Sequence, residues 1–128
     1  MYNSHIFGTP GHSKIFFENI VQHLSENTKI ISVKKEGKVF ASSILFLHNK
    51  YATSYSVVSR MERKYNVNDF LYIKSIEYCL ENNLKYFDFG RSVQDSGVYK
   101  YKKRWNPSII KLNYYYPLKG GQIPNYDL

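Results

Sequence analysis

The stretch TKIISVKKEGKVFASSILFLHNKYATSYSVVS, residues 28–59, decides the fold class of this chain. Its first eight residues alternate apolar and polar side chains, as a half-buried strand does. Glu36-Gly37 supplies a tight turn, and His48-Asn49-Lys50 supplies a second one. The three segments that these turns separate therefore predict an antiparallel meander with strands at residues 28–35, 38–47 and 51–59.

Helical periodicity appears on both sides of this meander. Residues 12–26 predict an amphipathic helix with Ser13 as its N-cap. Asn68-Asp69 marks the start of a second helix, which runs to residue 80 and which Asn82-Asn83 can end, because Asn tolerates the left-handed C′ position. The expected core-facing stripes are Ile15, Phe16, Ile20, Val21 and Leu24 in the first helix and Phe70, Leu71, Ile73, Ile76 and Leu80 in the second.

The rest of the chain predicts three further elements. Residues 85–89 form a short strand, residues 96–105 a short helix that Asn106-Pro107 stops, and residues 108–116 an alternating final strand. The sequence thus predicts one α+β (mixed α/β) domain over residues 1–128. Its ordered core is expected at residues 6–116, followed by a loose Gly/Pro-containing tail at residues 117–128.

Composition narrows the classes of function. The 128 residues suffice for one domain and carry a net charge of +8 with 13 tyrosines, which favours an anionic partner. No stretch reaches the roughly 18 apolar residues of a membrane span, and the first residues do not read as a signal peptide. Cys79 is the single cysteine, so neither an internal disulfide nor a zinc-binding Cys pair is expected. A cytoplasmic setting is the expectation, with no metal and no permanently bound cofactor.

Three basic residues precede the second helix and form the first candidate site. Arg60, Arg63 and Lys64 lie just before its N-terminus, where free backbone N–H groups favour anions. With Asn68 they make a candidate phosphate cradle. A mobile basic loop is an equal alternative, because no Gly-rich phosphate loop is present.

Polar residues at the end of the short strand form the second candidate site. Asp88, Gly90 and Arg91 would lie at a sheet edge, where ligand clefts often open. On spacing alone, a structural contact of Asp88 with Arg91 or with the backbone is favoured over a ligand site.

A basic and aromatic run, Tyr99 to Trp105, forms the third candidate. Tyr101 and Trp105 are four residues apart and would share a helix face, and the segment from Gly97 to Lys119 holds six basic residues and no acid. The alternative is an aromatic pair packed in the core with solvated lysines. None of the four histidines shows metal spacing or is assigned a catalytic role, and Cys79 is expected to be a buried apolar residue.

These motifs together resemble the C-terminal subdomain of the FemAB-like branch of the GNAT acyltransferase superfamily, which is related to the peptidoglycan-bridge aminoacyltransferases. The resemblance covers about residues 6–116 and also includes Ser59, Asn68 and the helix at 70–80. It is carried by Phe7-Gly8-Thr9-Pro10, Phe16-Phe17, Phe87-Asp88-Phe89-Gly90-Arg91-Ser92, Gly97 and Tyr101-Lys102-Lys103-Arg104-Trp105-Asn106.

The resemblance implies a GNAT-like fold and transfer of an acyl or aminoacyl group to an amine, in cell-wall or exopolysaccharide biosynthesis. Acyl-CoA or aminoacyl-tRNA would be the donor. Lys102 and Tyr101 occupy the family's Phe-Lys position and would be catalytic, while Asp88, Arg91 and Trp105 would line the cleft. The cradle of Arg60, Arg63, Lys64 and Asn68 lies where GNAT folds bind the donor phosphates.

The sequence departs from the family pattern in several places. Tyr101 replaces the usual Phe, and Asn106 and Asn83 stand where Gly is common. FemAB-like proteins are usually longer and pair two GNAT-like subdomains, so this chain would need an N-terminal partner subdomain or form a homo-oligomer. Two alternatives to an enzyme remain open: a non-catalytic basic module that binds RNA through Lys100, Lys103 and Arg104, and one half of a split two-subdomain assembly.

Overall fold

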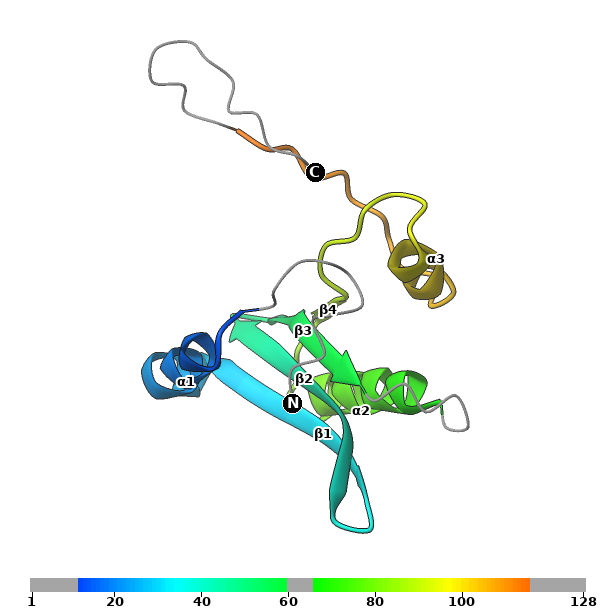
Figure 1. Ribbon diagram of the computed structural model, residues 1–128. Helices are drawn as coiled ribbons and strands as arrows, with labels where there is room; N and C mark the ends of the chain where they lie inside the picture. The colour runs from blue at the N-terminus through cyan, green and yellow to red at the C-terminus, as the bar shows by residue number, and fades with distance from the viewer. Residues whose placement is uncertain (1–11, 60–65, 116–128) are drawn as a thin grey trace. The chain divides into compact units, whose positions relative to one another are not determined.

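Residues 12–59 and 66–115 are described in a computed structural model of the chain. The chain divides into two compact units, Met1–Arg91 and Ser92–Leu128, and each is described by itself. The helices and strands follow the predicted order up to the short third helix (Figure 1). They are α1 (Lys14–His23), a 3-10 turn (Ser25–Asn27), β1 (Thr28–Lys35), β2 (Lys38–His48), β3 (Tyr51–Ser59), α2 (Val67–Glu81), β4 (Tyr86–Asp88) and α3 (Gly97–Lys103).

The first unit holds one mixed sheet of four strands in the order β1-β2-β3-β4. β1, β2 and β3 pair antiparallel, with Thr28 opposite Phe46 and Ala41 opposite Ser59, which confirms the predicted meander. β4 pairs parallel with β3, because the chain returns through α2 before it forms the fourth strand. The α+β fold expected from the sequence is therefore confirmed.

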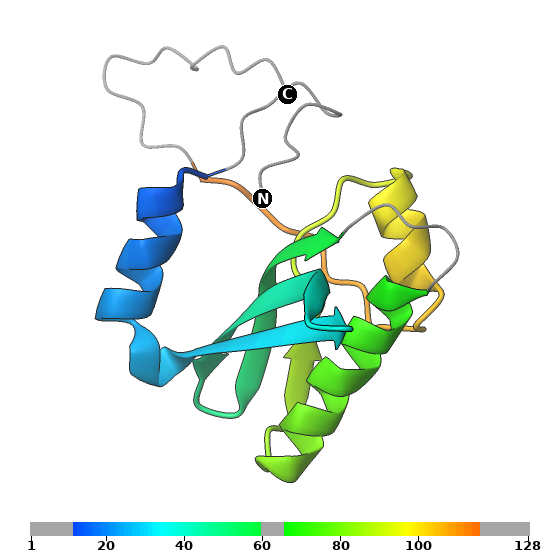
Figure 2. The ribbon, with the colours of Figure 1, turned by 60° about the horizontal axis from the view of Figure 1, so that its bottom comes forward.

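The two helices of this unit lie on opposite sides of the sheet (Figures 1 and 2). α1 meets the sheet through aromatic rings, since Phe16 lies 6.2 Å from Tyr55 and Tyr55 lies 4.9 Å from Phe46. Ser13 caps α1 as predicted, because its hydroxyl accepts a hydrogen bond from the Phe16 N–H at 3.3 Å.

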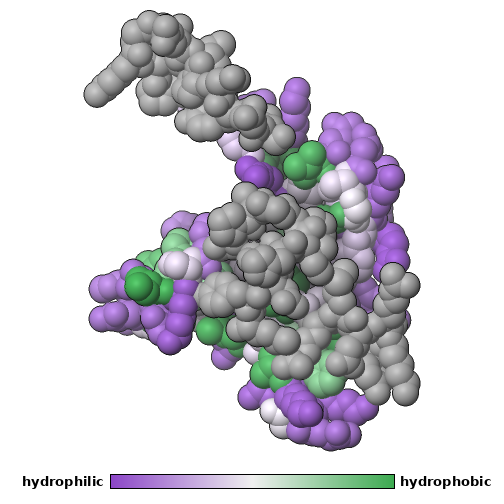
Figure 3. Space-filling view, viewed as in Figure 1, coloured by the Kyte–Doolittle hydropathy of each residue, from purple (hydrophilic) through white to green (hydrophobic). Residues whose placement is uncertain are grey.

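The predicted apolar stripe of α1 is largely wrong. Ile20 is the one buried residue of this helix, whereas Ile15 is 66% exposed and Val21 and Leu24 are exposed as well. Figure 3 shows such hydrophobic residues scattered among hydrophilic ones over α1. α1 contacts the sheet near the N-terminus of the helix. The apolar spacing therefore predicted a larger buried face of α1 than the structure shows.

The predicted stripe of α2 is confirmed at Leu71 but wrong at Phe70, Ile73 and Leu80, for a different reason. The buried residues are Leu71, Tyr72, Ser75 and Cys79, while the predicted Phe70, Ile73 and Leu80 are exposed. Small side chains at i, i+4 spacing let the helix lie close to the small residues of the sheet, among them Ala41, Ser43 and Ala52. Cys79 is buried as expected, and this burial raises the pKa of its thiol.

Hydroxyl groups inside this contact are hydrogen-bonded to one another. The Ser43 and Ser54 oxygens lie 3.3 Å apart across β2 and β3, and the Ser75 hydroxyl donates to the Leu71 carbonyl at 2.8 Å. Tyr72 also bonds the Ser54 side chain, although burial dominates and raises the pKa of its phenol. The hydroxyls of Ser43, Ser54, Tyr72 and Ser75 therefore have hydrogen-bond partners, as most buried polar groups do.

Two asparagines occupy positions at which the family commonly has glycine. Asn83, just past the end of α2, has φ +55°, which confirms its predicted left-handed C′ role. Asn106 has φ +53° shortly after α3. Both substitutions for glycine are mild because Asn adopts this conformation more readily than other non-glycine residues.

The second unit confirms the short helix but not the final strand. α3 begins at its N-cap Ser96, whose hydroxyl accepts from the Tyr99 N–H at 3.1 Å. Residues 108–115 form neither helix nor strand, and Tyr115 is 88% exposed. Alternation alone does not make a strand, because its backbone groups need a partner edge and this segment pairs with none in the described residues. The predicted tail at 117–128 lies outside those residues.

Within residues 12–59 and 66–115, no helix is long and apolar enough to cross a membrane.

The packing of α2 makes one prediction about stability. Leu71→Ala should lower the free energy of unfolding by about 2–5 kcal/mol, because Leu71 is fully buried and its loss leaves a cavity. Leu80→Ala is the matched control, since Leu80 is 70% exposed and should change stability by less than about 0.5 kcal/mol. Urea unfolding followed by circular dichroism measures both. Equal losses in the two variants would contradict the observed helix face.

Candidate active site

The parallel pairing of β3 with β4 is short. It joins Tyr51 to Tyr86, Ala52 to Phe87 and Thr53 to Asp88, and there it ends. β3 continues to Ser59 and stays paired with β2 over that length. In the described part of the chain, the other edge of β3 from Ser54 to Ser59 therefore has no strand partner. Its backbone groups can hydrogen-bond an extended ligand.

A β-bulge lies at the start of this unpaired edge. Ile44 pairs with Ser56 and Leu45 with Ser54, so Tyr55 is an extra residue in β3. Regular alternation would place Tyr51, Thr53, Tyr55 and Val57 on one face of the strand, but the bulge breaks this face, because Val57 pairs with Ser43 on the α2 side of the sheet. Bulges are common beside active sites and re-aim the side chain they carry. No glycine marks this bulge in β3, so no local pattern predicted it.

Asp88 and Gly90 form a tight turn at the end of β4. The Gly90 N–H donates to the Asp88 carboxylate at 2.8 Å, and Gly90 has φ +73°. This is the Asp88–backbone contact that the spacing favoured. Asp88 and Arg91 are both exposed, and the turn directs the chain out of the sheet beside the unpaired edge of β3.

The predicted phosphate cradle is described only in part. Arg60, Arg63 and Lys64 lie outside the described residues. Asn68 is in the first turn of α2, and its buried amide oxygen has no hydrogen-bond partner among the described residues. Asn66, the N-cap of α2, makes no side-chain capping hydrogen bond. The first N–H groups of α2 are thus not capped by that side chain.

The residues predicted around the third helix belong to the second unit. Tyr101, Lys102 and Trp105 are half-buried, whereas the neighbouring Lys100, Lys103 and Arg104 are exposed. Figure 3 shows hydrophilic side chains along the outer side of α3. The Arg104 guanidinium lies 5.2 Å from the centre of the Tyr101 ring and Lys103 lies 5.9 Å from that of Tyr99. The Lys102 side chain is thus less exposed to solvent than those of its neighbours Lys103 and Arg104.

An aromatic cluster that sequence reasoning missed surrounds the bulge. His12 stacks on Phe16 with ring centres 4.1 Å apart, and it also stacks on Tyr55 at 5.9 Å. The Tyr55 hydroxyl and His12 Nε2 lie 3.0 Å apart. The two residues are 43 positions apart, so no local spacing could have predicted the pair.

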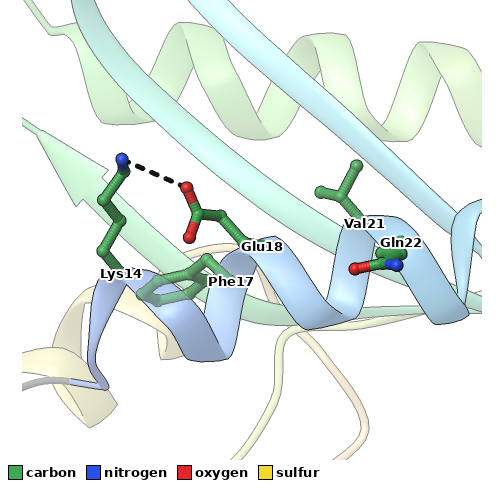
Figure 4. A pocket seen from close by; sticks show the side chains of 5 residues that line it. All are labelled: Lys14, Phe17, Glu18, Val21 and Gln22. Atoms are coloured by element: carbon green, nitrogen blue, oxygen red, sulfur yellow. Dashed lines mark ion pairs between the residues drawn. The ribbon is translucent and has the colours of Figure 1, made fainter.

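A shallow depression lies on α1 (Figure 4). It has a volume of about 390 Å³ and is lined by Lys14, Phe17, Glu18, Val21 and Gln22. Lys14 and Glu18 form an ion pair of 3.1 Å across it. None of the predicted site residues lines this depression. In the described residues, no three His, Cys, Asp or Glu side chains gather as metal ligands would.

Comparison with known families agrees with this geometry. The family model described as "Acetyltransferase (GNAT) domain" matches residues 2–103. The chain belongs to this family, whose members transfer an acyl group from acyl-CoA to an amine acceptor.

Solved structures support the fold. One is an aminoglycoside acetyltransferase from an uncultured soil metagenomic sample, in complex with sisomicin, with 11% identity and a TM-score of 0.66 over 89% of this chain and 80% of that chain. Another is a tetramutant of the BH1408 protein from Bacillus halodurans, with 13% identity and a TM-score of 0.66 over 85% of this chain and 76% of that chain. No curated protein matches the chain.

The turn after β4 makes a prediction about local stability. Asp88→Ala should lower the free energy of unfolding by about 1 kcal/mol, because the Gly90 N–H loses its acceptor. Asp88→Asn should retain most of the stability, since its amide oxygen can accept the same hydrogen bond. Thermal unfolding of both variants is the measurement. A loss in Asp88→Asn as large as that in Asp88→Ala would show that the charge matters more than the turn.

Proposed function

We propose that this chain transfers an acyl group from acetyl-CoA, or a related thioester, to an amine, with the donor lying along the unpaired edge of β3. The observation that carries this proposal is the end of the β3–β4 ladder at Thr53 and Asp88, while β3 continues to Ser59. The arm of coenzyme A is extended and contains amide groups. It can therefore add to this edge as a further strand would.

The donor phosphates would lie at the N-terminus of α2. This helix begins where the chain returns from the end of β3, and its first N–H groups favour an anion. Arg60, Arg63 and Lys64 come just before it in sequence and add three positive charges, against the two carboxylates of Glu62 in the same stretch and Asp69 in the first turn. The Asn68 NH2 group would donate a hydrogen bond to a phosphate, whereas its unpartnered side-chain oxygen, an acceptor, would need a donor group from the ligand.

In the transfer step, the acceptor nitrogen attacks the thioester carbonyl carbon. The C–N bond forms, negative charge develops on the carbonyl oxygen, and the C–S bond then breaks to release the thiolate. Backbone N–H groups at the Tyr55 bulge would stabilise the developing oxyanion, because they are held rigidly beside the donor edge. Lys102 and Tyr101 occupy the family's Phe-Lys position, and on that motif we propose them as catalytic; the same motif supports Asp88, Arg91 and Trp105 as residues that contact the substrates.

We place the chain in the FemAB-like branch of the family, with an acceptor from cell-wall or exopolysaccharide biosynthesis. Phe87-Asp88-Phe89-Gly90-Arg91-Ser92 and the Tyr101-Lys102 pair support this branch. The net charge of +8 also disfavours a polycationic acceptor such as an aminoglycoside, and it favours a neutral or anionic amine. Aminoacyl-tRNA is the alternative donor, since the same charge would attract it.

The exposed cations of α3 favour one alternative function. Lys100, Lys103 and Arg104 point to a basic module that binds RNA without catalysis, with the stacked tyrosines as further contacts. Such binding would weaken steeply as salt is raised, because it releases counterions.

Calorimetry with acetyl-CoA, followed by a thiol-release assay, tests the proposed function. The acceptor panel is D-glucosamine, ethanolamine and sisomicin. We expect the wild-type chain to bind acetyl-CoA and to release thiol with at least one amine. Lys102→Met should lower kcat by about 100-fold or more while the fold is kept, if its charge stabilises the oxyanion. Lys111→Met is the control, because Lys111 is an exposed lysine of the same unit.

Each outcome of this experiment has a distinct meaning. No acetyl-CoA binding, together with salt-sensitive binding of a tRNA, would replace the enzyme with the RNA-binding module. Donor binding and turnover with an unchanged rate in Lys102→Met would remove Lys102 from the mechanism and leave the reaction in place.

A further inference from the structure

We infer that Tyr55 and His12 form a proton-accepting pair for the acceptor amine, an inference that rests on the proposed function. Tyr55 is the extra residue of the β3 bulge, where the edge proposed for the donor begins. Its hydroxyl lies 3.0 Å from His12 Nε2. The bulge therefore joins the donor edge to a side chain that can accept a proton.

The pair is accessible and is held in place by rings. Tyr55 is 41% exposed and His12 is exposed too, so an acceptor can reach the hydroxyl. Phe16 stacks on His12, and Phe46 lies 4.9 Å from Tyr55. A hydrogen bond that served only to stabilise the core would be expected among buried groups, whereas this one faces solvent.

In the described residues, the other rings that contact His12 and Tyr55 carry no charge. The rings that contact the pair are Phe16 and Phe17 from α1 and Phe46 from β2, and none of them titrates. Lys14 and Glu18 of α1 pair with each other at 3.1 Å. His12 Nε2, a ring nitrogen that can accept a hydrogen bond and a proton, is thus the final acceptor of the proton.

The proton steps balance as follows. The acceptor arrives as an ammonium ion and gives one proton to the Tyr55 oxygen while the Tyr55 proton passes to His12 Nε2, from which it is released to solvent. The free amine then forms the C–N bond. As the C–S bond breaks, the second nitrogen proton goes to the departing thiolate. Tyr55 is thus the catalytic residue, and His12 acts through it as a positioning residue and proton acceptor.

The test compares two acceptors with acetyl-CoA as donor. Ethanolamine is almost entirely an ammonium ion at neutral pH and must lose a proton, whereas hydroxylamine is uncharged and need not. Tyr55→Phe and His12→Gln should each lower kcat/KM for ethanolamine by about 100-fold. Both variants should keep the hydroxylamine rate and the affinity for acetyl-CoA. Tyr55→Phe retains the ring contacts, so it tests the hydroxyl without disturbing the cluster.

The double variant and the pH profile separate a relay from a structural role. Tyr55→Phe combined with His12→Gln should lose no more than either single variant, because the two groups act as one unit. In all three variants the ethanolamine rate should rise about tenfold per pH unit near neutrality, since only the free amine then reacts. Wild type should show a flatter profile. Matched controls are Tyr51→Phe and His23→Gln, which keep the same chemistry elsewhere on β3 and α1.

Ethanolamine rates within threefold of wild type in both variants would overturn the inference and leave the proposed function intact. Equal losses with ethanolamine and hydroxylamine would also overturn it, because a structural defect affects both acceptors. If the wild-type chain binds no acetyl-CoA, the proposed function fails first and this inference fails with it.

Discussion

The unequal pairing of the two edges of β3 is the constraint on which the rest of the structure depends. One edge pairs with β2 as far as Ser59, while the other pairs with β4 only up to Thr53. A parallel partner cannot follow through a tight turn, so the chain must cross over through α2 before it returns as β4. This crossover also places the N-terminus of α2 just after the end of β3. The crossover from β3 through α2 to β4 thus leaves a strand edge unpaired and also supplies a helix N-terminus.

Close packing of α2 on the sheet makes this connection stable. The contact is formed by small residues, with Ser75 and Cys79 on the helix and Ala41, Ser43 and Ala52 on the strands. Leu45 and Leu71 fill the remaining space and are fully buried. Hydroxyls in such a contact would be costly without partners, and the Ser43–Ser54 and Ser75–Leu71 hydrogen bonds remove that cost. Side-chain size and hydrogen bonding therefore determine which face of α2 is buried, more than hydrophobicity does.

The difference between local sequence patterns and tertiary packing explains how far the structure could be predicted from the sequence. Strands, turns and caps depend on neighbouring residues, so Ser13, Asn83 and the bounds of β1 and β3 were predicted correctly. The buried face of α2 was not, because Phe70 and Leu80 are more apolar than the Ser75 and Cys79 that are buried instead. The strand at 108–116 failed because pairing needs a second strand, which alternation does not supply. In the site, Asp88 and Gly90 are neighbours and their contact was foreseen, whereas the bulge and the His12–Tyr55 pair are tertiary features without a local pattern.

The bulge at Tyr55 lies where the unpaired edge of β3 begins. An unpaired strand edge is a liability for aggregation, and bulges are one device by which natural sheets twist such edges away from further pairing. The same extra residue shifts the alternation of β3 beyond Tyr55, so that Val57 pairs with Ser43 on the side of Ser54, while Tyr55 meets the rings of α1. Without it, Ser56 would face α2 and Val57 would face α1, since side chains alternate along a regular strand. One inserted residue therefore keeps Val57 on the α2 side of the sheet while Tyr55 lies with the rings of α1, at the point where the edge of β3 becomes free.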